Sequence, residues 1–334
     1  DAPEISFPNS PQTYPIERFA PKSSKQKKNV STDKTKLDME KPNAVSCSFG
    51  INSSTTRCFN WVSAGSFDEY VFLKNSDGTW TAFESYKTRT GEVTQSESFP
   101  RRKEFSERTN NTAYARINGI FPGCNARYTS HKCILDVVDS AVSEKTTYTY
   151  IVGRKTKAGT PDFNHCSQEQ TFTLYPTSYV PRIYQTSDQQ GFHWVEYQVW
   201  SAAAIALNNK IEADCSEENI IPVLINTGDA TQNGTRVNEW LDYFNGGNCL
   251  FNHLEQMDVV GNNDLCGANP EILGTGDDIG KSNSFFFHVC YCYEVDERDG
   301  FLPIITSDSG IDRYVTSTYY FDTEDYRFLM CNSE

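Results

Sequence analysis

Three short polar segments carry side chains of types that could bind metal ions. Asp188, Asp229 and Asn262 each follow a run of mainly apolar or β-branched residues, and a glycine stands close to each of them. Carboxylate and amide oxygens are the ligands that hard divalent cations prefer, and one carboxylate can bridge two ions about 4 Å apart. Each segment alone could be an ordinary turn, whereas all three in this order predict a dinuclear metal site.

The elements around these segments are expected to alternate between strands and helices. Apolar runs predict strands at 182–186, 220–226 and 257–260, and apolar residues at helical spacing predict helices at 195–209 and 235–245. This order is typical of an α/β layer with a parallel sheet, in which functional side chains lie at the carboxyl ends of the strands. Two later segments, 316–321 and 326–331, predict a hairpin around an acidic turn.

Residues 43–176 have a different, all-β pattern. Polar and apolar side chains alternate in short segments, and no convincing amphipathic helix separates them; examples are 58–62, 70–73, 147–153 and 171–175. Phe59 and Trp61 are expected to share one face of a strand. The series predicts a β-sandwich of immunoglobulin or fibronectin type. The polar stretch 84–112 is expected to be a long loop.

Residues 1–42 are expected to form an extended arm. Several prolines precede Lys22, Lys25, Lys27 and Lys28 in a polar run with little periodicity. Such a composition cannot bury enough apolar surface to offset the entropy lost on ordering. A solvated tail is favoured over an electrostatic contact for the lysines. The α/β part then occupies residues 177–334.

The composition excludes some classes of function. The chain has 334 residues, 37% of them hydrophobic and 13% aromatic, with a formal net charge of −14. This length suits roughly two domains with sizeable cores. A strongly negative chain lacks the basic face that general nucleic-acid binding requires, so no nucleic-acid partner is expected. No run approaches the ~20 apolar residues of a membrane span.

Cysteine usage and sequons favour a secreted or extracellular protein, with vacuolar, lysosomal or particle-associated locations as variants. The eleven cysteines include no Cys-x-x-Cys pair, so disulfides are preferred over a zinc site or free buried thiols, with at least one cysteine left over. The chain begins at Asp1, which we take as processing or truncation. Four sequons make it a candidate glycoprotein, although several can arise by chance: Asn29, Asn52, Asn110 and Asn233.

With these residues in view, the chain resembles the calcineurin-like metallophosphoesterases, and among them the purple acid phosphatase group. The family's first block, Asp-x-His or Asp-x-Gly after a strand, matches Asp188 with Gln190 or Gly191 following. The second block matches Gly228-Asp229, and the third, Gly-Asn-His-Asp/Glu, matches 261–264. The group's fibronectin-like sandwich is matched by strands within 148–172. The resemblance covers about 43–334 and implies an α/β (α+β) metallophosphoesterase-like sheet sandwich behind an all-β domain.

The resemblance also implies a role for each matched residue. Asp188 would ligate one metal ion, Asp229 would bridge two, and Asn262 would ligate the second; the ions would be Mn, Fe or Zn. Such ions polarise a phosphoryl oxygen and supply a hydroxide nucleophile. Asn263 stands where the family's histidine assists the leaving group or contacts phosphate, but an amide cannot be a general acid. Gln232 replaces the tyrosine that ligates ferric iron, so a purple iron centre is not expected.

The family's final histidine blocks have no match before Glu334. The chain's own histidines are not convincing substitutes, and Asp264 is expected to be a structural acceptor or helix cap. We therefore expect that the C-terminal half of the phosphoesterase domain is missing here and is supplied by a separate polypeptide, as in a processed or split protein. Without it, the sheet would keep unpaired backbone groups and an exposed apolar face.

Three functions follow from these expectations. The first is a metal-dependent phosphoesterase that hydrolyses phosphomonoesters or nucleotides once the site is completed. The second is a catalytically degenerate structural or interaction protein with the phosphoesterase fold, in a larger secreted or virion assembly. The third, a carbohydrate- or cell-surface-binding module on the aromatic-rich sandwich, rests on composition alone. A measurement of bound metal would distinguish the first of these functions from the second.

Overall fold

The computed structural model describes residues 41–93 except 51 and 66, and residues 126–265 except 192–196, 218, 233 and 235–236. It also describes the short pieces 294–295, 305–306 and 312–315, and residues 319–331 except 324. Nearly all of the expected arm lies outside these residues, as do His193, His288 and the sequons at Asn29, Asn110 and Asn233.

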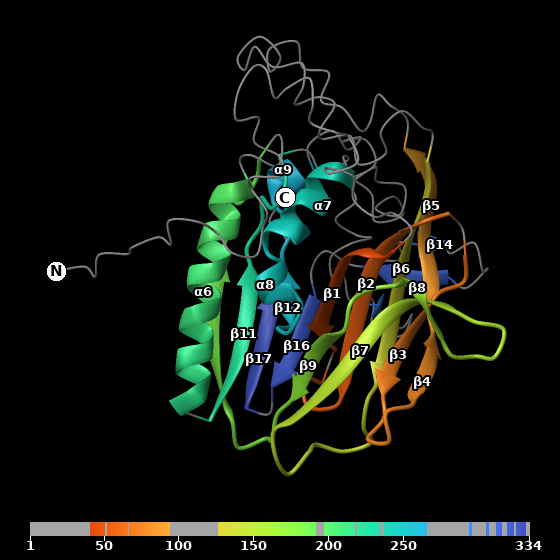
Figure 1. Cartoon of the computed structure of the whole chain (residues 1–334). Helices are drawn as coiled ribbons and strands as arrows, with labels where there is room; N and C mark the ends of the chain where they lie inside the picture. The colour runs from red at the N-terminus through yellow and green to blue at the C-terminus, as the bar shows by residue number, and fades with distance from the viewer. Residues whose placement is uncertain are drawn as a thin grey trace, which may run out of the picture.

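Two antiparallel sheets form a β-sandwich (Figure 1). The first sheet has the order β1-β2-β6-β5, from β1 (Asn43–Phe49), β2 (Thr56–Ala64), β6 (Ala126–Asp136) and β5 (Tyr86–Val93). The second has the order β4-β3-β7-β8, with β9 also paired to β7; its strands are β3 (Tyr70–Lys74), β4 (Trp80–Glu84), β7 (Thr146–Lys155), β8 (Pro161–Cys166) and β9 (Gln170–Leu174).

The side-chain alternation of the strands builds the core of the sandwich. Phe59 and Trp61 are two residues apart on β2, so both point to the inner face, and both are fully buried. The ring of Phe59 lies 4.8 Å from that of Tyr150 and 5.6 Å from that of Phe172, both of the second sheet. The expectation that Phe59 and Trp61 share one face is confirmed.

The expectation of a long loop at 84–112 is wrong in its first part. Residues Tyr86–Val93 form β5, which pairs antiparallel with β6. Polar strands of this kind show no hydrophobic alternation, and the pairing with β6, more than thirty residues later in the chain, decides their conformation. Residues 94–112 lie outside the described part of the chain.

The second part of the molecule is a three-stranded parallel sheet with helices. Strands β10 (Val180–Thr186), β11 (Ile220–Asn226) and β12 (Gln256–Asp258) lie in that order. They alternate with α6 (Tyr197–Glu217), α7 (Val237–Gly246), α8 (Asn248–Phe251) and α9 (Asn262–Leu265). The predicted strand–helix alternation is confirmed, although α6 continues past residue 209, where Ile211 is still buried against the core.

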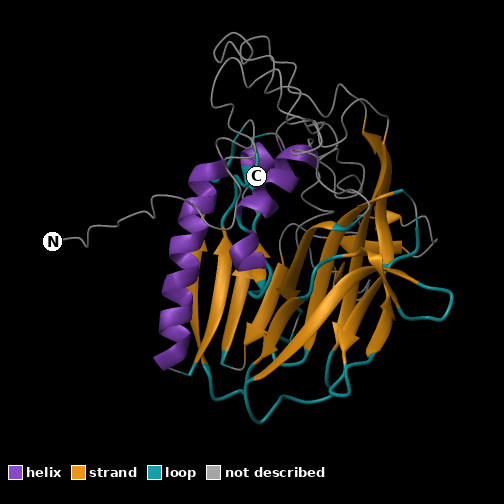
Figure 2. Ribbon diagram, in the orientation of Figure 1, coloured by secondary structure: helices purple, strands orange, loops and turns teal. Residues whose placement is uncertain are grey.

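Strand β11, at the centre of the parallel sheet, is covered on both faces. Leu224 faces the helices and packs in one core with Trp200 of α6 and Trp240 of α7; Figure 2 shows these helices gathered on one side of the sheets. Val223 and Ile225 point the other way, because side chains alternate along a strand. The hairpin of β16 (Tyr319–Thr323) and β17 (Tyr326–Met330) covers that face. This hairpin was predicted from the sequence.

The remaining described strands form a small antiparallel sheet of order β13-β15-β14. They are β13 (Glu294–Val295), β14 (Ile305–Thr306) and β15 (Asp312–Val315).

A buried ion pair joins the sandwich to the α/β part. Arg57 of β2 donates from Nε to Glu255 Oε1 at 2.8 Å, and neither side chain is exposed. Arg57 also donates to the main-chain carbonyl oxygens of Ser53 and Thr173, and Glu255 accepts the N–H of Thr173. The two parts of the described chain therefore share a desolvated polar contact.

The expected disulfides are not found among the described cysteines. All seven are free thiols, and most of them are buried side chains of the cores: Cys47, Cys58, Cys133, Cys166, Cys215, Cys249 and Cys331. In the part of the chain that the structure describes, no helix is both long and apolar enough to cross a membrane.

Candidate functional site

The three residues expected to bind metal lie around one pocket. Asp188 follows β10, Asp229 follows β11, and Asn262 begins α9 just after β12. Because the strands are parallel, their carboxyl ends meet at the same edge of the sheet. All three residues line an open pocket of about 500 Å³. The structure thus brings together side chains that are far apart in the sequence.

The backbone at this edge adopts conformations that few residues tolerate. Asp188 has a φ of 58° and Asp229 a φ of 56°, in the left-handed region, and Gly228 has a φ of 107°. Gly261 lies against the second loop, since a Cβ on it would stand 2.3 Å from the main-chain N of Asp229. Such strained positions are concentrated at functional sites, where surrounding contacts hold them.

Asn263 fixes the carboxylate of Asp229. The main-chain N–H of Asn263 donates to Asp229 Oδ1 at 2.9 Å, and its side-chain NH₂ donates to Oδ2 at 2.8 Å. Its own Oδ1 accepts a hydrogen bond from Gln232 Nε2 at 2.8 Å. Asn263, the candidate catalytic residue, is thus engaged by its neighbours and does not line the pocket. The structure shows it as an orienting residue for Asp229.

Asp264 ties the second and third loops together. Its Oδ1 accepts the main-chain N–H of Thr231 at 2.9 Å and the Thr231 hydroxyl at 3.0 Å, while its Oδ2 accepts the N–H of Gly261 at 3.0 Å. The side chain is fully buried, and burial raises the pKa of Asp264 to about 6 against the opposing effect of these hydrogen bonds. This is the structural acceptor that the sequence predicted.

Sequence reasoning assigned no contact to two neighbours of the expected ligands. The Ser187 hydroxyl donates to Asp188 Oδ2 at 2.6 Å. Gln190 reaches the second loop: its main-chain N–H donates to Asp229 O at 2.9 Å. Both residues lie within the first polar segment of the sequence. That position was the signal from which sequence reasoning could have found their role.

The hairpin closes the other side of the pocket. Leu329, Met330 and Cys331 line it opposite the three loops. Nothing in their local sequence indicates this position, because it depends on how β16 and β17 pack over the parallel sheet.

The donor set suits part of a metal site. Asp188, Asp229 and Asn262 offer oxygen atoms only, and each oxygen of a carboxylate can accept more than the one hydrogen bond that Asn263 gives it. Hydrogen bonds from neighbours of this kind normally hold metal ligands in position. Yet among the described residues no three His, Cys, Asp or Glu side chains stand close enough together to hold an ion. The described residues therefore offer donor atoms of the right kind for a divalent ion, but too few of them to complete a metal site.

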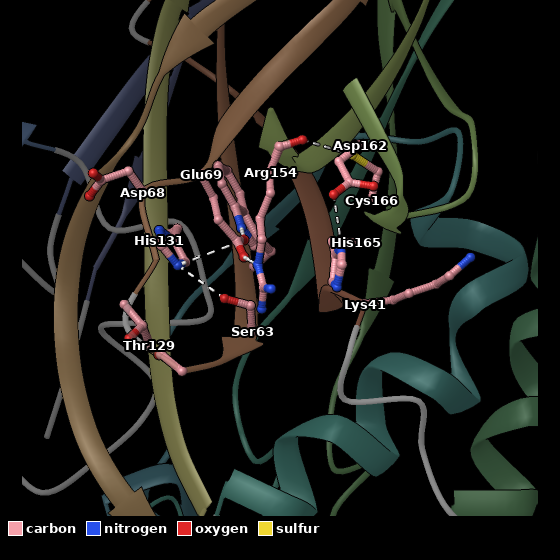
Figure 3. Close-up of polar contacts among 12 residues, drawn as sticks. Lys41, Ser63, Asp68, Glu69, Thr129, His131, Arg154, Asp162, His165 and Cys166 are labelled. Atoms are coloured by element: carbon pink, nitrogen blue, oxygen red, sulfur yellow. Dashed lines mark hydrogen bonds and ion pairs between the residues drawn. The ribbon is translucent and has the colours of Figure 1, made fainter. Parts of the chain in front are cut away.

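A second polar cluster lies inside the sandwich (Figure 3). His131 is fully buried, stacks on Trp61 with ring centroids 5.2 Å apart, and contacts Ser63 Oγ at 3.1 Å. Glu69 stands between His131 and Arg154, at 3.8 Å and 3.6 Å. Burial lowers the pKa of His131 to about 3 and raises the pKa of Glu69. The Ser63 side chain is buried with them.

The described sheets, helices and hairpin together form a fold that a solved protein shares. A solved structure with this fold is a purple acid phosphatase, PPD1, from seeds of yellow lupin (Lupinus luteus): the TM-score is 0.51 at 14% identity, over 86% of this chain and 44% of that one. A second, PhoD, aligns over 86% of this chain and 51% of its own with a TM-score of 0.42 at 10% identity.

The likeness to the purple acid phosphatase shows the fold. The chain spans about half the length of the two solved structures. No protein-family model matches the sequence, and no curated protein matches it.

Proposed function

We propose that this chain carries part of a metal-dependent phosphoesterase site, in which two divalent ions promote the hydrolysis of a phosphomonoester. The convergence of Asp188, Asp229 and Asn262 on one pocket carries the proposal. Asp188 would hold one ion, Asp229 would lie between two, and Asn262 would hold the second. Ions bound in this way polarise the phosphoryl group and make water a better nucleophile.

The chain's own residues have supporting roles in this proposal. Asn263 holds both oxygens of Asp229 in place, and Ser187 holds one oxygen of Asp188. Gly228 and Gly261 let the second and third loops approach each other. These contacts fix the direction of the carboxylates before any ion binds, which lowers the cost of assembling the site.

The remaining ligands would come from a separate C-terminal polypeptide. The support is the incomplete donor set together with apolar side chains left uncovered on two edge strands. Val180 and Ile183 of β10 are 56% and 55% exposed, and Leu329 of β17 is 69% exposed. Among the described strands, β10 and β17 each pair on one side only, so a partner could add strands there.

The sandwich fits a fibronectin- or immunoglobulin-type domain in this proposal. Its first sheet, β1-β2-β6-β5, corresponds to the strand order A-B-E-D, and its second, β4-β3-β7 with β8 and β9, corresponds to C′-C-F-G. An extracellular location is part of the same proposal. The sequon residue Asn52 is exposed, so a mass loss of the protein from its natural source after N-glycosidase treatment would support that location.

Hydrolysis of a generic phosphomonoester tests the proposal. The protein is assayed with its copurifying polypeptide and added Mn²⁺, Fe²⁺ or Zn²⁺. Asp229→Asn is expected to lower kcat by about 100-fold or more, because it removes a negative ligand shared by both ions. Asp325→Asn, an exposed change in the hairpin turn, serves as the control and is expected to keep full activity. Equal activity of wild type and Asp229→Asn would refute the proposal.

The rival function is a structural or interaction protein that keeps this fold without catalysis. The lack of any three-residue cluster of His, Cys, Asp or Glu among the described residues favours it. Elemental analysis of the complete assembly separates the two. Stoichiometric metal that disappears in Asp188→Asn and Asp229→Asn supports the enzyme, whereas absence of metal supports the structural role.

A further inference from the structure

We infer that Tyr197, the first residue of α6, is a positioning residue of the candidate site, because its hydroxyl group holds the chain immediately after Asp229. The inference rests on the proposed function, since it concerns the same site. It assigns a role to a side chain that lies outside the three loops and is fully buried beneath them.

The peptide unit that joins Ala230 to Thr231 is held at both ends by buried side chains. The Tyr197 hydroxyl donates to the carbonyl oxygen of this unit, Ala230 O, at 3.0 Å. The N–H of the same unit belongs to Thr231 and donates to Asp264 Oδ1 at 2.9 Å. None of these four residues is more than 1% exposed. Because both polar groups of the unit have a fixed partner, its plane is fixed as well.

This peptide unit begins one residue after a strained position. Asp229 has a φ of 56°, a conformation that residues other than glycine keep only where surrounding contacts hold them. Loss of the Tyr197 hydroxyl would free one end of the neighbouring unit and let Asp229 relax. Its carboxylate would then move relative to the pocket that it lines and to the NH₂ group of Asn263.

The hydroxyl of Tyr197 stays protonated and can therefore act as a donor. Burial raises its pKa well above the ordinary value for tyrosine, and the neighbouring Glu239 and Asp242 add to the rise. The main-chain N–H of Gly191 opposes the rise as a hydrogen-bond donor to the same oxygen. Gly191 belongs to the first loop and Ala230 to the second, so Tyr197 acts on both loops.

Tyr184 offers a matched control for this role. A buried tyrosine normally finds a hydrogen-bond partner, whether or not the contact serves a site. Tyr184 packs in the same core as Tyr197, and its hydroxyl donates to Asp214 Oδ2 at 2.7 Å, further along α6. Tyr184→Phe removes the same atom as Tyr197→Phe, but from a contact that involves none of the three loops.

Hydrogen exchange of single amides, measured on the full chain with its copurifying polypeptide, is the first test and needs neither metal nor activity. The N–H groups of Gln190 and Asn263 donate to Asp229 O and Oδ1, both at 2.9 Å, so their exchange reports the position of Asp229. In Tyr197→Phe both amides are expected to exchange roughly tenfold faster or more, while the amides of β11 keep their rates. In Tyr184→Phe all these rates should stay unchanged.

Hydrolysis of a generic phosphomonoester by the same preparations, with added Mn²⁺, is the second test. Tyr197→Phe is expected to lower kcat by about 10- to 100-fold, the usual effect of losing a contact that orients a metal ligand, and to leave KM within about twofold. Tyr184→Phe should keep the wild-type kcat. A purely structural role of Tyr197 would speed exchange throughout β11 and leave kcat unchanged.

The outcomes separate this inference from the function on which it rests. Unchanged exchange at Gln190 and Asn263, or an unchanged kcat in Tyr197→Phe, would overturn the role of Tyr197 alone. An inactive wild type would refute the proposed function, and the exchange rates would still decide whether Tyr197 holds Asp229. Should Tyr197→Phe not fold, proton NMR of the wild type decides: a slowly exchanging Tyr197 hydroxyl proton supports the inference, and its absence overturns it.

Discussion

Asp264 shows how one buried carboxylate can hold two loops of a site. It accepts the main-chain N–H groups of Thr231 and Gly261, and its side chain is fully buried. Asp264→Ala leaves both donors buried without a partner, so we expect the free energy of unfolding to fall by about 2–4 kcal/mol. Urea denaturation measures this. Asp136→Ala removes an exposed acceptor of Thr56 and should cost less than about 0.5 kcal/mol; equal losses would contradict the prediction.

His131 predicts a dependence of stability on pH. Burial lowers its pKa to about 3, whereas the unfolded chain takes up this proton near pH 6.5. The unfolded state therefore binds more protons between these values, and stability falls as the pH drops below 6.5. From pH 6.5 to 5 the loss from His131 is up to about 2 kcal/mol. Glu69, whose pKa is raised, opposes this loss; Lys87 and Asp68 also act on the ring, and Arg154 acts through Glu69.

Unfolding in urea at pH 6.5 and pH 5 checks this prediction. His131→Gln keeps a polar side chain at the same place but cannot be protonated, so its loss of stability on acidification should be smaller than that of the wild type. The contribution of Glu69 is common to both proteins and cancels in the comparison. The same acid loss in wild type and variant would rule out His131 as its source.

The sequence predicted that Asp188, Asp229 and Asn262 lie together, as the structure has them, but it did not predict their contacts. Asp188, Asp229 and Asn262 were found because acidic and amide residues follow three strand patterns, and parallel strands place such ends together. The clamp of Asn263 on Asp229 joins residues of different loops, and no local pattern encodes it. The disulfide expectation failed for the described cysteines because a cysteine count carries no information on geometry.

Strand β2 carries the contact that joins the sandwich to the α/β part. Arg57 and Glu255 are paired at 2.8 Å with no exposure, so removing one partner leaves an uncompensated buried charge. We expect Arg57→Met to reduce the free energy of unfolding by about 3–5 kcal/mol. Arg327→Met removes an equally short but exposed pair, with Asp322, and should cost less than about 1 kcal/mol. Denaturation of both variants measures the two losses of unfolding free energy. Similar losses would contradict the role of burial.

The elements differ in how well the sequence predicts them. β11 was predicted at its observed bounds because its apolar run, fully buried on both faces, is typical of a central parallel strand. β5 was missed because its residues, Tyr86–Val93, show no apolar alternation and pair with a distant strand. α6 runs past its expected end because Ile211 still reaches the core. Tertiary packing, rather than local preference, decided the last two cases.

At the scale of the whole molecule, the described chain has two edges that a folded domain normally covers. Strands β10 and β17 each pair on one side only among the described strands, and both expose apolar side chains. Such edges promote strand addition and association in water. The chain alone is therefore expected to self-associate at micromolar concentration, and the C-terminal polypeptide that we propose would compete with this association.

A double variant tests this expectation. Ile183→Lys on β10 and Leu329→Lys on β17 place charges on residues that are 55% and 69% exposed, so thermal stability should change by no more than about 0.5 kcal/mol. Charged residues on sheet edges oppose edge-to-edge pairing. Light scattering after size-exclusion chromatography should therefore show oligomers of the wild type and monomers of the variant. Val199→Lys, a 74% exposed change on α6, is the control and should keep the oligomers. A wild-type chain that is monomeric alone would show that these edges are not binding surfaces.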